Sequence, residues 1–141
     1  MTLYLWIAVG SAVGGCLRYA IGRAMMESSA TFPWSTLLIN VLGCFVIGFF
    51  GTLTLAGSRY AVPETARMFV MVGICGSFTT FSSFSLQTFE LLRDGDWKRA
   101  LGNVAFSVLL CLGAVALGHW AAQPATRAFA VTQTAEEECT G

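Results

Sequence analysis

Four long stretches of the chain contain no Asp, Glu, Lys or Arg. They cover residues 1–17, 28–58, 68–89 and 100–126. Each reaches or approaches the roughly 20 apolar residues that cross about 30 Å of hydrocarbon. The pattern predicts an all-α integral membrane protein with four transmembrane helices. The expected helices span residues 3–22, 35–55, 65–92 and about 100–122, the last one ending before a proline at position 124.

Composition supports a membrane location. The 141 residues are 55% hydrophobic and 11% charged, and soluble domains carry about 25% charged residues. The mean hydropathy is +0.68. The first stretch could alternatively be a signal peptide, but signal peptides begin with a positively charged segment, and the opening MTLYLW contains no Lys or Arg. The net charge of zero gives no reason to expect a nucleic-acid partner.

Domain organisation is simple. Residues 1–122 form one four-helix transmembrane unit, and residues 123–141 form a polar tail that we expect to be disordered. The five cysteines include no C-x-x-C pair, so the spacing indicates neither a disulfide framework nor a metal site. His119, the only histidine, is expected to be a polar residue at the membrane interface.

The positive charges are divided between the two sides of the membrane. With four spans, Arg59, Arg67 and Arg127 share one side, and the other carries Arg18, Arg23, Arg93, Lys98 and Arg99. Taken alone, this modest bias favours one fixed orientation that places the five charges in the cytoplasm. It is also compatible with insertion in both orientations, which would give an antiparallel dimer.

Several polar side chains fall at membrane depth, where each must find a partner or water. Arg18 shares a helix face with Gly10 and Gly14, so it either snorkels to the interface or supplies positive charge to a vestibule. Asn40 on the second helix is either a structural link between helices or a hydrogen-bond donor on a pathway. The same two alternatives apply to Asn103 and Ser107, which share a face of the fourth helix.

The third helix contains the segment GICGSFTTFSSFS at residues 73–85. Glycine, threonine and serine weaken a regular helix, so we expect a break within residues 76–80. A break exposes backbone carbonyls, which are suitable ligands for a small hard cation. Phenylalanines recur every third residue at positions 78, 81 and 84, a pattern that ordinarily indicates packing.

The only carboxylate within a predicted span is Glu90, near the end of the third helix. A proton-coupled or cation-exporting transporter would require a buried acid. A small multidrug exporter, which depends on a glutamate in its first helix, therefore fits poorly. A non-transporting assembly subunit remains an alternative, and nothing in the sequence indicates an enzyme.

Three motifs carry a resemblance to a known family. GGCLRY at 14–19, WSTLLINVLGCFVIGF at 34–49 and GICGSFTTFSSFS at 73–85 resemble the signatures of the Fluc/CrcB fluoride channels. The match covers about residues 3–120, in the same order and at the same separations.

The resemblance implies a channel in the bacterial inner (plasma) membrane that passively exports fluoride and so reduces its toxicity. The assembly would be an antiparallel, dual-topology homodimer with helix 3 broken at mid-membrane. Residues implied to line the fluoride pathway are Asn40, Phe81, Phe84, Ser82, Ser83 and Ser107, with Arg18 in the vestibule. Backbone carbonyls of Gly76 and Thr79 from both subunits would hold a structural sodium ion.

The sequence departs from the family pattern at three positions. Ser77 stands where a second glycine is usual, but the implied sodium ligands there are backbone atoms. Gln87 occupies a position that is often glutamate, which could alter entry or exit of the ion. Asn103 replaces a tyrosine found in some relatives, so its polar role is open.

Overall fold

The computed structural model describes residues 1–54 and 62–140, with side chains up to residue 123. Its elements are α1 (Thr2–Ala24), α2 (Trp34–Leu53), α3 (Glu64–Met68), the π-helix η1 (Phe69–Cys75), α4 (Gly76–Phe78), α5 (Phe81–Arg93) and α6 (Trp97–Thr140). No strand occurs in this described part of the chain. The predicted end of the second helix at residue 55, and residues 57–61 of the turn after it, lie outside the described residues.

Four helical stretches are long and apolar enough to cross a membrane. They are Thr2–Ala24, Trp34–Leu53, Glu64–Arg93 and Trp97–Gln123. This confirms the four predicted spans. The third comprises the consecutive elements α3, η1, α4 and α5.

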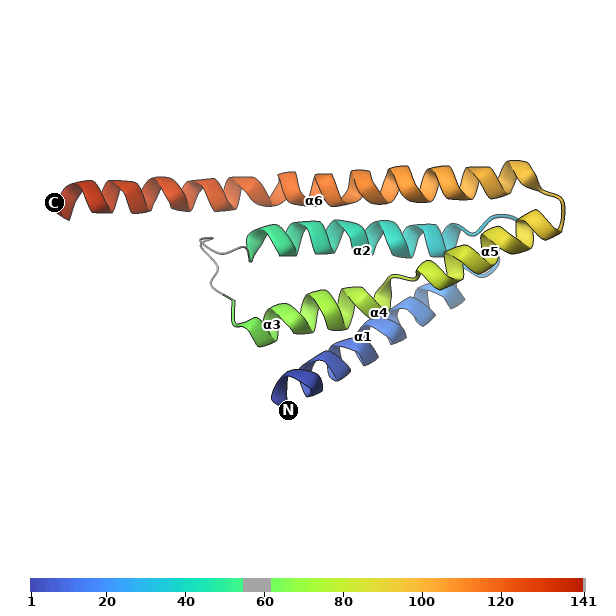
Figure 1. The fold of residues 1–141 in the computed structure, drawn as a ribbon, viewed down its shortest axis with the longest axis horizontal. Coiled ribbons are helices and arrows are strands. Elements are labelled where there is room, and N and C mark those ends of the chain that lie inside the picture. The colour runs from blue at the N-terminus through green and yellow to red at the C-terminus, as the bar shows by residue number, and fades with distance from the viewer. Residues whose placement is uncertain (55–61, 141) are drawn as a thin grey trace.

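The spans lie side by side in an order that differs from their order in the sequence (Figure 1). α1 packs against η1 and α4, these two elements also contact α2, and α2 packs along α6. α5 diverges from the line of α4 and contacts the first part of α6. α2, which is distant from α4 and α5 in the sequence, thereby contacts both of them.

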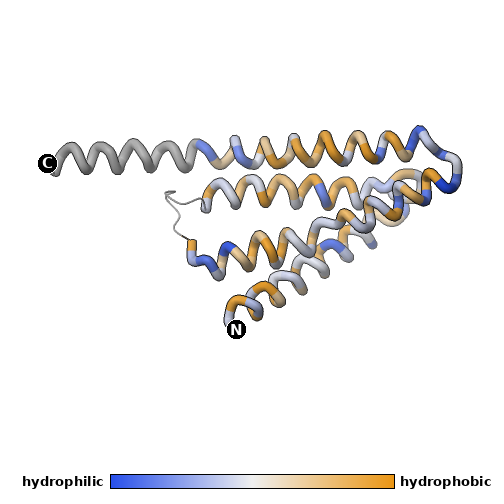
Figure 2. Tube along the Cα trace, viewed as in Figure 1, coloured by the Kyte–Doolittle hydropathy of each residue, from blue (hydrophilic) through white to orange (hydrophobic). Residues whose placement is uncertain are grey.

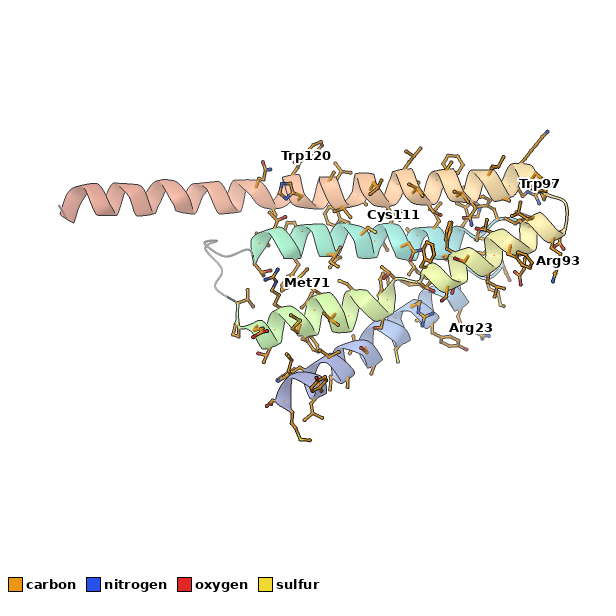
Figure 3. All side chains as sticks on the ribbon, viewed as in Figure 1. Arg23, Met71, Arg93, Trp97, Cys111 and Trp120 are labelled. Carbon is orange, nitrogen blue, oxygen red and sulfur yellow. The ribbon has the colours of Figure 1, made fainter. Side chains whose placement is uncertain are left out.

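Hydrophobic residues predominate along the membrane-crossing helices (Figure 2), and many large apolar side chains are exposed. Few apolar residues are buried within the single chain, namely Leu37, Ile39, Cys75, Ala100, Ala114 and Ala122. Trp97 and Trp120 are both 63% exposed near the two ends of the membrane-crossing part of α6 (Figure 3). At 1.5 Å per residue about 34 Å of helix separates these two side chains, which matches an apolar layer bounded by interfacial aromatic residues.

The connection between α5 and α6 is short and well defined. Gly95 has a φ of +80°, a left-handed conformation that glycine adopts without a steric penalty. Asp96 then caps α6, because its Oδ1 accepts a hydrogen bond from the Arg99 backbone N–H at 3.1 Å. Arg23, Arg93 and Trp97 lie at this end of the molecule (Figure 3).

The helix that we expected to end near residue 122 continues to Thr140. The prediction relied on Pro124, whose ring lacks the N–H needed for a helical hydrogen bond. The sequence after this proline contains four alanines and three consecutive glutamates, residue types that favour helix. The predicted end of the last helix was therefore wrong, whereas the division at 122/123 and the disorder of the tail stay predictions.

Small residues set the contacts between helices. A Cβ at Gly10 would stand 3.0 Å from the Cα of Gly73, where α1 meets η1. A Cβ at Gly118 would collide with the carbonyl oxygen of Phe45 and stand 2.8 Å from the backbone nitrogen of Phe49. Close backbone approach at glycine is a common basis of helix association in membranes.

Replacing Gly118 with alanine should therefore destabilise the protein. The added methyl group would push α6 away from α2, and overpacking of this kind costs about 1–3 kcal/mol. Gly113→Ala on the same helix is the matched control, because nothing lies within 4 Å of the position that its Cβ would take. Thermal unfolding in detergent measures the difference, and equal stability of the two variants would contradict the packing described for α2 and α6.

Candidate functional site: an interrupted helix between two cavities

The third span is interrupted between α4 and α5. Thr79 and Thr80 both have extended backbone conformations, with φ and ψ of −72° and 156° and of −150° and 103°. Thr79 still closes the preceding turn, since its backbone N–H donates to the carbonyl of Cys75 at 3.0 Å and its hydroxyl donates to the same oxygen at 2.9 Å. The two extended residues stand between the end of α4 at Phe78 and the start of α5 at Phe81.

Asn40 from α2 binds the interrupted backbone. Its Oδ1 accepts the Thr80 backbone N–H at 2.8 Å, and its Nδ2 donates to the Thr80 carbonyl at 3.3 Å. An asparagine amide carries both a donor and an acceptor, so one side chain satisfies both polar groups of one peptide residue. Asn40 is thus a structural link, and its second Nδ2 hydrogen is not used by this pairing.

The Thr80 side chain caps the start of α5. Its buried hydroxyl accepts the backbone N–H of Ser83 at 3.2 Å and donates to Ser83 Oγ at 2.9 Å. Ser82 Oγ lies 3.2 Å from the same hydroxyl. Both predicted pathway serines therefore contact Thr80, a residue that the sequence analysis did not single out. An N-cap threonine followed by a helical segment was the available signal.

The interruption redirects the donors that a continuous helix would give to its own carbonyls. The Thr80 N–H would bond to Gly76, and the Ser83 N–H would bond to Thr79. Both donate elsewhere, to Asn40 and to the Thr80 hydroxyl. The carbonyls of Gly76 and Thr79 therefore do not receive their usual helical donors.

Arg18 contributes to the same region from α1. Its Nε donates to the Ser77 carbonyl at 3.2 Å, so it is anchored to backbone near the interruption. Ser77 in turn donates its hydroxyl to the Gly73 carbonyl at 2.7 Å and lies 2.9 Å from the Ser11 carbonyl. The serine that departs from the family pattern thus joins α4 to both η1 and α1.

Thr80 lines two separate cavities. The larger, of about 430 Å³, is mostly apolar, and its wall includes Asn40, Gly76, Thr79, Phe81, Phe84 and Ser107. The smaller, of about 320 Å³, is bordered by Arg18, Arg23, Ser83 and Gln87, among others. Most of the predicted residues are therefore distributed between two adjacent cavities, and Ser82 lines neither.

Phe81 and Phe84 form a pair on the wall of the larger cavity. Their ring centroids are 5.3 Å apart with an interplanar angle of 46°. Phe81 is 79% exposed within the single chain. This exposure leaves the ring edge open to the cavity, to lipid or to a second copy.

A buried hydrogen-bond chain leads to this cavity from α5. Asn103, only 1% exposed, donates from Nδ2 to the Thr88 hydroxyl at 2.8 Å and accepts the Ser107 hydroxyl at 3.4 Å. Thr88 donates onward to the carbonyl of Phe84 at 2.7 Å. In this arrangement Ser107 presents oxygen lone pairs to the cavity, since its proton is directed to Asn103.

Two further polar residues have defined surroundings. Gln87 Oε1 is buried and has no hydrogen-bond partner among the described residues, on the wall of the smaller cavity. His119 contacts the Thr52 hydroxyl through Nδ1 at 2.8 Å and the Gln123 amide through Nε2 at 3.1 Å. His119 thus joins α6 to α2 near the membrane boundary and lies far along α6 from the interruption.

Fold and site together define a multi-pass helical membrane protein. Its third span is interrupted beside two cavities that each have polar residues in their walls. The profile of a family described as "CrcB-like protein, Camphor Resistance (CrcB)" matches residues 5–119. The chain therefore belongs to the CrcB family.

Several relatives are similar to this chain over most of its length. The fluoride-specific ion channel FluC of Gluconobacter oxydans (strain 621H) is 57% identical over 139 residues, which cover 97% of this chain and 96% of the relative. The proteins of the same name from Methylocella silvestris and Opitutus terrae are each 58% identical. Those matches cover 82% and 86% of this chain, and 89% and 93% of the relatives.

Proposed function

We propose that this protein is a channel that passively conducts fluoride out of the cytoplasm across a bacterial inner membrane, and so limits fluoride toxicity. The observation that carries the proposal is the 57% identity to a fluoride-specific ion channel over 97% of the chain. The cavity at the interrupted span supplies a physical basis for it. Conduction requires no chemical step, so the protein is not an enzyme.

The larger cavity offers a fluoride ion few but suitable partners. Fluoride holds its water tightly, and a pore must replace that water without binding the ion so strongly that it cannot leave. The edges of aromatic rings carry partial positive charge, and Phe81 and Phe84 both line the cavity. Asn40 adds its remaining amide hydrogen, while its other polar atoms hold the Thr80 backbone.

The smaller cavity serves as the vestibule. Arg18 and Arg23 border it, and fixed positive charge raises the local concentration of anions. Ser83 and Thr80 also border it, and Thr80 lines the larger cavity as well. A membrane potential that is negative inside favours anion exit by about 2.3 kcal/mol per charge per 100 mV.

The functional unit is an antiparallel homodimer of chains inserted in both orientations, with helix 3 interrupted at mid-membrane. One chain leaves Gly76 and Phe81 exposed beside the interruption. The carbonyls of Gly76 and Thr79 lack their usual helical donors, and carbonyl oxygens suit a hard cation such as sodium. Two such oxygens are fewer than the roughly six that hard cations take, so a symmetry-related copy would supply more of the shell.

Replacing either ring with leucine tests the proposed pathway. Leucine keeps most of the bulk but removes the positive ring edge, so fluoride efflux from liposomes should fall at least about tenfold in Phe81→Leu and Phe84→Leu. That fall corresponds to about 1.4 kcal/mol of lost stabilisation. Phe89→Leu is the control, because Phe89 is an exposed ring on the same helix, outside the larger cavity.

A fluoride-selective electrode follows the efflux, and circular dichroism confirms that each variant is folded. Wild-type efflux from both cavity variants would mean that the rings only pack. Absence of fluoride efflux from the unmodified protein would instead favour a non-transporting assembly subunit.

Gly76→Val tests the dimer and the proposed ion. Within one chain a Cβ at Gly76 would meet only the Met71 carbonyl, at an ordinary 3.7 Å, so the valine should cost a single chain little. Against a second copy the branched side chain would displace the facing carbonyls. We expect light scattering in detergent to show a loss of dimer, and the sodium dependence of its stability to disappear.

Gly15→Val is the matched control, since nothing lies within 4 Å of a Cβ there. An unchanged dimer with the same sodium dependence in Gly76→Val would contradict the proposed interface.

A further inference from the structure

Three cysteines gather on the wall of the larger cavity. Cys44 comes from α2, Cys75 from η1 and Cys111 from α6. Cys44 and Cys111 are half-buried free thiols. α2 and α6 run in the same direction, with Gly48 against Val115 and Thr52 against His119, and the same offset one turn earlier places Cys44 opposite Cys111. Cys111 lies on the side of α6 that faces α2 (Figure 3). A pair of thiols from neighbouring helices thus meets inside the cavity.

The register of the two helices places this pair next to the pathway residues. Cys44 follows Asn40 by one helical turn, and Cys111 follows Ser107 by one turn. Residues four apart share a helix face, and one turn advances about 5.4 Å along the axis. Asn40 and Ser107 line the same cavity. An ion bound between the two thiols would therefore narrow the space beside Asn40 and Ser107.

We propose that Cys44 and Cys111 form a binding site for a soft cation that takes two thiolate ligands, and that its occupancy blocks conduction. Soft thiolate ligands select soft metal ions over hard ones. The described residues contain no group of three or more His, Cys, Asp or Glu side chains placed to hold a metal. A tetrahedral zinc site needs more protein ligands than a pair, whereas the mercuric ion is satisfied by two sulfurs in line.

The binding step conserves atoms and charge. Neutral mercuric chloride reacts with the two thiols, two S–H and two Hg–Cl bonds break, and two S–Hg bonds form. Two protons and two chloride ions are released. Because the reagent is neutral and apolar, it can reach this largely apolar cavity through the lipid without passing a filter selective for anions.

Direct binding tests the thiol pair without reference to conduction. The reference protein is the full chain with Cys16→Ser and Cys139→Ser, which keeps the three cavity cysteines. Titration with mercuric chloride, followed by the ultraviolet absorbance of the S–Hg bond, should saturate at one tightly bound ion per chain. Cys44→Ala or Cys111→Ala in this background should weaken binding by at least about a hundredfold, because the second thiolate acts as an intramolecular ligand.

Cys75→Ala is the matched control and should keep the tight site. Equal loss of binding in Cys75→Ala, or tight binding that survives in both Cys44→Ala and Cys111→Ala, would overturn the assignment. Cys44 and Cys111 lie on different helices. If one of the two alanine variants fails to fold, mercuric chloride binding to the other still decides the assignment.

Fluoride efflux from liposomes tests the block, which rests on the proposed function. Stoichiometric mercuric chloride should stop efflux through the reference protein, a dithiol should restore it, and Cys44→Ala and Cys111→Ala should each lose this sensitivity relative to their own untreated rates. Tight binding with undiminished efflux would overturn the block and leave the binding site standing. A reference protein that conducts no fluoride would contradict the proposed function, while the titration would still decide the binding site.

Discussion

The structure depends on two hydrogen bonds between the side-chain amide of Asn40 and the backbone of Thr80. A helix can be interrupted at membrane depth only where protein or water satisfies the polar groups that the break exposes. Asn40 does this for both groups of Thr80 at once. The Thr80 hydroxyl then restarts the helix by capping α5. One asparagine and one threonine thereby set where α4 ends and α5 begins.

The direction of the chain after this point determines the site. α5 turns away from the axis of α4 toward the first part of α6 (Figure 1). As a result Phe81 and Phe84 line one cavity and Ser83 lines the other. Hydroxyl donors around the break are already used within the protein. The Ser107 hydroxyl donates to Asn103, and the Thr80 hydroxyl donates to Ser83. A sparse set of donors together with ring edges suits an ion that must both enter and leave.

The sequence predicted the parts of this structure that local composition determines. The four spans follow from stretches of the sequence without charged residues. The pairing of Asn40 with Thr80 joins residues 40 positions apart, so no local pattern could distinguish the two roles considered for Asn40. In the structure Asn40 bonds to both polar groups of the Thr80 backbone, and one hydrogen of its amide lies outside this pairing.

Other features depended on contacts that only the folded chain reveals. Arg18 was expected either to snorkel or to face a vestibule, and it borders a cavity while bonding to the Ser77 carbonyl. Ser82 and Ser83 were treated alike, but only Ser83 lines a cavity. The helix end at 122 was wrong because the alanine- and glutamate-rich sequence beyond Pro124 outweighed the local effect of the proline.

Amide hydrogen exchange at Thr80 tests the central constraint most directly. In the unmodified protein in micelles, the Thr80 amide should exchange slowly, because Asn40 accepts its hydrogen bond. In Asn40→Leu the same amide should exchange about fivefold faster or more, the equivalent of about 1 kcal/mol for one hydrogen bond, while amides in the middle of α2 and α6 keep their rates. Equal Thr80 exchange in the two proteins would contradict the account, because it would mean that Asn40 does not hold the interruption.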